Sequence, residues 1–115
     1  MSTKGYITTH VIDLAHGKPA LNMQANLYRR VENKWQFLGK DFSNEDGRMT
    51  KFLQNDSLQN GNYKMVFESG AYYKHHNLDT FYPEISIIFN ITDSNQNYHI
   101  PLLLNQYGFS TYRGS

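Results

Sequence analysis

ISIIFNI, residues 85–91, is the strongest strand pattern in the sequence and decides the fold class. β-Branched and aromatic residues favour extended backbone, and Pro83 lies just before the run, where a strand tolerates it. The polar residues 95–97 then turn the chain into a second apolar run, residues 98–104. Both faces of residues 100–104 are apolar, which indicates a strand covered on both sides, in a small sandwich by another subunit.

Shorter patterns around this pair predict the other strands and one helix. Residues 6–14 alternate, with His10 on one face and Asp13 on the other. Further strands are expected at residues 23–31, 35–40, from 48, 63–67 and 107–112, with turns at 16–19, 43–47 and 60–62. A short helix is expected over 71–77, capped by Ser69. Seven or eight short strands with one small helix predict a mostly-β, antiparallel β-sandwich.

The clearest turn ends in Asp46-Gly47, which supplies the positive φ that short hairpins require. Arg48 therefore starts a strand, where its long side chain can be aimed from a fixed base. Asp46 itself is explained by the turn rather than by acid–base work.

Composition narrows the function classes. The 115 residues suit one domain, residues 1–115, and 15% aromatics suffice for a core. The net charge is only +1 and the basic residues are scattered along the chain, so neither nucleic acid nor a membrane surface is an expected partner. There are no cysteines, which excludes disulfides and thiolate metal sites. No signal-peptide core or membrane span is recognisable, so a cytoplasmic location is expected.

Two histidines lie in the middle of predicted strands, His10 and His99. One strand histidine is more often structural than catalytic. Two of them, with Arg48 and the polar residues 112–115, form a more specific set for moving protons near neutral pH. A nearby arginine would disfavour imidazolium and keep the rings available as bases.

The other histidines are expected to be unremarkable. His16 lies in a turn, where solvent would surround it. His75 and His76 are adjacent on the predicted helix and point to different sides, with no third ligand in view. No metal site is therefore expected.

Five segments carry a family resemblance: TTHVID at 8–13, GKPA at 17–20, DGR at 46–48, YHIPLLL at 98–104 and YRGS at 112–115. They are similar to the 5-hydroxyisourate hydrolases, the enzyme branch of the transthyretin family, in order over nearly the whole chain. The final tetrapeptide is the most specific segment, because it separates this branch from the hormone-carrying transthyretins. Ile100, where valine is common, is a mild departure.

The resemblance implies a transthyretin-like sandwich of two four-stranded sheets with a short helix after the fifth strand. It also implies a homotetramer, a dimer of dimers, with active sites in clefts at the dimer–dimer interface. The implied reaction is hydrolytic opening of the 5-hydroxyisourate ring to 2-oxo-4-hydroxy-4-carboxy-5-ureidoimidazoline during urate degradation, and no cofactor is implied.

The family's functional residues fall on His10, Arg48, His99 and the segment 112–115, each with its residue type intact. We expect His10 and His99 to position and deprotonate water and to return a proton, and Arg48 to bind substrate and stabilise developing negative charge. The resemblance implies a catalytic role for Ser115 as well. Substrate binding is expected from Arg48, Tyr112, Arg113, Gly114 and Ser115.

The sequence leaves open how His10 and His99 divide the acid and base roles. It also leaves two alternative functions. One is a non-catalytic carrier of an aromatic small molecule, which would need neither the two histidines nor the Tyr-Arg-Gly-Ser end. The other is a generic interaction sandwich, which predicts a disordered C-terminal segment.

Overall fold

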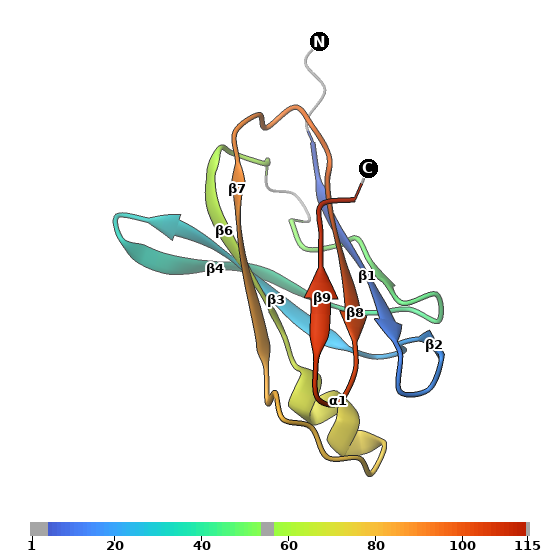
Figure 1. Cartoon of the computed structure of the whole chain (residues 1–115). Helices are drawn as coiled ribbons and strands as arrows, with labels where there is room; N and C mark the ends of the chain where they lie inside the picture. Colours follow the sequence, from blue (N-terminus) through green and yellow to red (C-terminus); the bar gives the residue numbers. More distant parts are fainter. Residues whose placement is uncertain (1–4, 54–56, 115) are drawn as a thin grey trace.

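Two β-sheets pack face to face, with a short helix at one end of the sandwich (Figure 1). The computed structural model describes residues 5–53 and 57–114. Its elements, in order, are β1 Ile7–Asp13, β2 Lys18–Pro19, β3 Gln24–Val31, β4 Lys34–Phe42, β5 Arg48–Met49, β6 Gly61–Phe67, α1 Ser69–His75, β7 Ile85–Ile91, β8 Tyr98–Leu104 and β9 Phe109–Thr111. No helix in these two ranges has the length and hydropathy needed to cross a bilayer. The expected mostly-β sandwich with one short helix is confirmed.

The first sheet has the order β2-β1-β8-β9, with β5 also paired to β1, and the second has the order β4-β3-β6-β7. β1 and β8 run parallel over seven residue pairs, whereas the other strand pairs are antiparallel. The sequence predicted antiparallel pairing throughout, because short turns join consecutive strands. β1 and β8 are far apart in the chain, and no hairpin constrains their direction. Two-residue β2, expected as a turn, raises this sheet to five strands.

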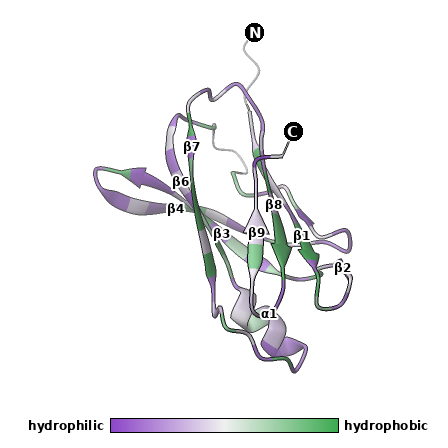
Figure 2. Cartoon of the chain, viewed as in Figure 1, coloured by the Kyte–Doolittle hydropathy of each residue, from purple (hydrophilic) through white to green (hydrophobic). Residues whose placement is uncertain are grey.

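The core lies between the sheets. In β1 the residues with odd numbers are buried, as the alternation predicted, and the even-numbered ones face outward. The second half of β8 is largely hydrophobic (Figure 2), with Ile100, Leu102 and Leu104 in the core. On its outer face Pro101 is buried within the same chain, beside Gly114. Cover of that face by another subunit remains a prediction.

The helix begins earlier than predicted. α1 starts at Ser69, Glu68 occupies the N-cap position, and no side chain caps the helix. Ser69 is buried, and its hydroxyl donates to the Tyr82 carbonyl at 2.8 Å. The predicted serine cap was therefore wrong, because a tertiary acceptor takes the hydroxyl that a cap would need.

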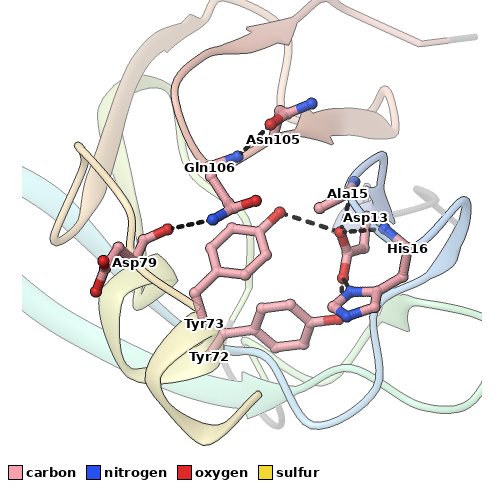
Figure 3. A network of polar contacts seen from close by, with 8 residues as sticks. All are labelled: Asp13, Ala15, His16, Tyr72, Tyr73, Asp79, Asn105 and Gln106. Carbon is pink, nitrogen blue, oxygen red and sulfur yellow. Dashed lines mark hydrogen bonds and ion pairs between the residues drawn. The ribbon is translucent and has the colours of Figure 1, made fainter. Parts of the chain in front are cut away.

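A buried carboxylate joins the helix to the first sheet (Figure 3). Asp13, at the end of β1, is fully buried. It accepts hydrogen bonds from the hydroxyls of Tyr72 at 2.6 Å and Tyr73 at 3.0 Å, and from Nδ1 of His16 at 2.6 Å. Burial by itself raises the pKa of Asp13, but the bonds from Tyr72, His16 and Tyr73 outweigh it and hold the pKa below its ordinary value.

The histidine in this cluster, His16, is exposed, as expected for a turn residue. Its side chain keeps 31% exposure and also bonds to Asp13, which the sequence did not predict. Its ring centroid also lies 5.0 Å from that of His76. The turn residue is therefore part of the packing that fixes α1.

Candidate active site

His10 and Arg48 are neighbours on the outer face of the first sheet. His10 is half-buried and belongs to the outward-facing residues of β1. β5 pairs antiparallel with β1 in a register that sets Arg48 directly opposite His10. Residues directly opposite in an antiparallel pair project their side chains to the same face. The imidazole and the guanidinium are thus held side by side.

The turn before Arg48 is fastened to β1 at its glycine. The Gly47 carbonyl accepts the Val11 N–H at 2.8 Å. Gly47 has φ +79°, and a Cβ there would press on the Val11 carbonyl oxygen and lie 3.3 Å from Cδ2 of His10. Only glycine meets both the conformation and the close approach without strain.

Asn44 organises the same turn, and sequence reasoning did not single it out. Its Oδ1 accepts the backbone N–H of Asp46 at 2.9 Å and of Arg48 at 3.0 Å. Its backbone carbonyl accepts the Gly47 N–H at 2.9 Å. An asparagine at the start of a turn is the available sequence signal, since its side chain mimics a backbone turn. Asn44 therefore sets the direction from which Arg48 leaves the turn.

His99 reaches this face from β8. The parallel ladder pairs Thr8 with His99 and His10 with Pro101. His99 therefore lies diagonally across from His10, on the neighbouring strand and two residues along the ladder. Oγ1 of Thr8 lies 2.8 Å from Nδ1 of His99. Thr8 was not among the predicted site residues, because the contact joins positions 91 apart in sequence.

The charges on this face bear on one another. Burial lowers the pKa of His99, and its electrostatic interactions with Arg48 and His10 lower it further. The sequence-based expectation that an arginine keeps a site histidine neutral therefore holds for His99. Arg48 and His10 are thus close enough to His99 to influence its proton binding.

The residues of the C-terminal segment contact different parts of the molecule. Gly114 lies on His99: its N–H donates to the His99 carbonyl at 2.8 Å. The Arg113 guanidinium instead donates to Oε1 of Gln96 at 2.8 Å and lies 4.5 Å from the centroid of the Tyr98 ring. Tyr112 is 59% exposed. Ser115, also predicted for the site, lies outside the described residues.

A cavity of about 350 Å³ lies beside this segment. Tyr112, Arg113 and His99 line it together with Ile87 and Phe89 of β7. His10 and Arg48 are not among the residues that line it. His99 thus lies between the two sets: it lines the cavity with Tyr112 and Arg113, and it is near the His10–Arg48 pair.

Within residues 5–53 and 57–114 there is no group of three histidine or acidic side chains placed to hold a metal ion. The chemistry available is that of two imidazoles and one guanidinium. Imidazoles move protons near neutral pH, and a guanidinium binds planar oxygen-rich groups and stabilises an oxyanion. This set is suited to hydrolysis.

Fold and site together define a transthyretin-type β-sandwich with a polar, two-histidine face. A sequence profile of the HIUase/Transthyretin family matches residues 7–114. The chain belongs to that family.

Three similar proteins narrow the comparison. A 5-hydroxyisourate hydrolase from Salmonella dublin is 39% identical over 109 residues, which span 95% of this chain and 80% of that protein. The structure of Klebsiella pneumoniae 5-hydroxyisourate hydrolase matches with a TM-score of 0.85 and 28% identity, covering 96% of this chain and 99% of the other. A crystal structure of (S)-allantoin synthase matches with a TM-score of 0.88 and 31% identity; it covers 99% of this chain, which spans only 45% of that protein.

Proposed function

We propose that this protein is a hydrolase that opens the ring of 5-hydroxyisourate by cleaving its cyclic amide. The product is 2-oxo-4-hydroxy-4-carboxy-5-ureidoimidazoline, and the reaction belongs to urate degradation in purine catabolism. The observation that carries the proposal is the His10–Arg48 cross-strand pair beside His99. The relatives named for this hydrolysis, matched over nearly the whole chain, support it.

The three groups divide the chemical work. Amide hydrolysis needs a deprotonated water, stabilisation of the oxyanion, and a proton for the leaving nitrogen. His10 and His99 supply the proton transfers, and the lowered pKa of His99 favours its neutral, proton-accepting form. Arg48 binds the heterocycle through paired hydrogen bonds and stabilises the negative charge that develops on the carbonyl oxygen.

The C-terminal residues contribute substrate contacts in this proposal. Tyr112 and Arg113 border the cavity beside His99, and Gly114 lies against the His99 backbone. We assign them to shaping the substrate cleft. Ser115, which follows directly, is proposed to fix substrate and water.

The site is proposed to be completed in a homotetramer, a dimer of dimers with clefts at the dimer–dimer interface. β7 and β9 are the last strands of their sheets, and Ile88 and Phe109 on them are exposed apolar side chains. Sedimentation equilibrium tests this assembly: four chains per particle are expected, and a monomer at micromolar concentration contradicts it.

We further propose that residues 1–115 act as one domain in the cytoplasm. The continuous family match over residues 7–114 supports the single domain. The absence of cysteine is compatible with a reducing compartment. Cell fractionation with an antibody against the protein tests the location.

The polar character of this face argues against the carrier alternative. A channel for an aromatic ligand would present apolar side chains, whereas His10, Arg48 and His99 present titratable and charged groups. Nothing observed in the part of the chain that the structure describes favours the carrier.

The test is a spectrophotometric assay. 5-Hydroxyisourate is generated in place from urate with urate oxidase, and its decay is followed with and without the protein. We expect faster decay in proportion to protein concentration, with the ring-opened product identified by NMR. Spontaneous decay unchanged by folded protein contradicts the proposal, and calorimetric binding of an aromatic ligand would then support the carrier.

A further inference from the structure

The Thr8 hydroxyl is the polar side-chain partner of His99 among the described residues. Thr8 and His99 are Cα partners in the parallel ladder between β1 and β8, and Oγ1 lies 2.8 Å from Nδ1. Both residues are half-buried. The contact is therefore built into the sheet register rather than left to a mobile side chain.

The His99 ring is held on two sides. Nδ1 faces Thr8, and the Cδ2 side faces Gly114, where an added Cβ would lie 2.6 Å from Cδ2. Gly114 is itself tied to His99 by the N–H to carbonyl bond of 2.8 Å. With these two sides occupied, Nε2 is the ring nitrogen left to meet water or substrate.

The direction of the Thr8–His99 bond decides which proton chemistry Nε2 can do. A hydroxyl can donate to a ring nitrogen or accept from a ring N–H. Arg48 lies close enough to lower the pKa of His99, and a guanidinium offers only donors. The Thr8 hydroxyl can accept an N–H from Nδ1, and a positive charge near the ring disfavours a second N–H. The proton of neutral His99 then resides on Nδ1.

We propose that Thr8 is a positioning residue for the hydrolysis: its hydroxyl accepts a hydrogen bond from Nδ1–H of His99 and leaves Nε2 as the base that deprotonates water. This assignment rests on the proposed function. The water proton moves to Nε2, the water oxygen bonds to the amide carbon, and the carbon–nitrogen bond breaks. The proton taken up at Nε2 is returned to the leaving ring nitrogen, so that one water is consumed.

The bond to Thr8 also matters after proton transfer. Imidazolium carries positive charge on both nitrogens, and a hydrogen bond from a charged donor is stronger than one from a neutral donor. Oγ1 of Thr8 therefore stabilises the protonated ring more than the neutral ring. Thr8 carries no charge and is assigned no substrate contact in this proposal, so its loss should change turnover rather than binding.

Two substitutions at one position provide the kinetic test. Thr8→Val keeps the shape and removes the acceptor, whereas Thr8→Ser keeps the hydroxyl. We expect Thr8→Val to lower kcat by about tenfold to a hundredfold with KM little changed, and Thr8→Ser to stay within about threefold of the wild type. Thermal melts of both variants establish that they are folded.

A second readout does not depend on activity. Long-range ¹H–¹⁵N NMR distinguishes the two neutral tautomers of His99 in the wild-type protein. We expect the Nδ1–H form in the wild type and a shift toward Nε2–H in Thr8→Val.

The outcomes separate this proposal from the function beneath it. A wild type that does not accelerate 5-hydroxyisourate decay contradicts the hydrolase function and the role of Thr8 with it. An active wild type with an unimpaired Thr8→Val variant, or with His99 as the Nε2–H tautomer, overturns the role of Thr8 alone. If Thr8→Val does not fold, the wild-type tautomer decides.

Discussion

At the scale of single residues, the behaviour of His99 depends on its surroundings. Burial and the electrostatic interactions with Arg48 and His10 favour its neutral form. A neutral imidazole is the form that accepts a proton from water, so the same groups that lower the pKa prepare the ring for base chemistry. The position of Arg48, fixed by its turn, thus has both a substrate role and an electrostatic one.

The first prediction concerns the titration of His99. We expect its pKa, measured by NMR, to lie below the ordinary histidine value of about 6.5, and to rise toward that value in Arg48→Gln. Neutral His99 then persists as pH falls below about 6.5. Arg30→Gln, which alters an arginine lying over Trp35, serves as the control and leaves the titration unchanged. A His99 that titrates at or above the ordinary value contradicts this account.

The sequence sufficed to propose His10, Arg48 and His99 as candidates, because their residue types and places in strands or turns are visible in it, and the fold brings them to one face. It did not yield Thr8 or Asn44. The Thr8 contact depends on the parallel register between β1 and β8, which no local pattern encodes. The role of Asn44 depends on bonds to Asp46 and Arg48 that are geometric rather than compositional.

At the scale of elements, the short strand β5 controls the site. It contains only Arg48 and Met49, with Met49 buried and Arg48 exposed. Its attachment to β1 runs through Gly47, whose carbonyl accepts the Val11 N–H. The strand pattern and the Asp-Gly turn were predictable, since both follow from local chemistry. The partner strand was not, because β5 could have paired with a neighbour in sequence.

Gly47→Ala tests this element. The left-handed φ and the contact with the Val11 carbonyl together should cost about 1–3 kcal/mol of stability and displace Arg48, lowering kcat/KM by about tenfold or more. Gly17→Ala is the matched control: it has φ +69° and open space around the added Cβ. We expect that control to lose about 1 kcal/mol and to keep its activity. Chemical denaturation and the decay assay measure both effects; equal activities of the two variants would show that the close approach at Gly47 has no part in placing Arg48.

At the scale of the whole molecule, the Asp13 cluster joins the first sheet to the helix. It links β1, which carries His10, to α1 through Tyr72 and Tyr73 (Figure 3). The sequence predicted that Asp13 faces away from His10, which the buried position confirms. Its tyrosine partners lie about sixty residues away and became visible only in the folded chain.

Asp13→Asn should destabilise the protein by about 2–4 kcal/mol, because an amide cannot accept all the donors that the carboxylate satisfies. The folded pKa of Asp13 is lowered, so its contribution is present above the unfolded value of about 3.9 and is lost as pH falls through the folded value. Urea unfolding between about pH 3 and pH 7 should therefore show a shallower acid loss in Asp13→Asn than in the wild type. Asp79→Asn, an exposed carboxylate, is the control; a variant as stable as this control contradicts the role of the cluster.

The most direct test of the central claim compares two double variants in the 5-hydroxyisourate decay assay. His10→Ala with Arg48→Ala removes the cross-strand pair. Arg30→Ala with His75→Ala removes the same two residue types from β3 and α1, outside the site. We predict that the first falls to the uncatalysed rate while the second stays within about twofold of the wild type. Equal loss, or retained activity in a folded His10→Ala, Arg48→Ala protein, would contradict the assignment of hydrolysis to this face of the sheet.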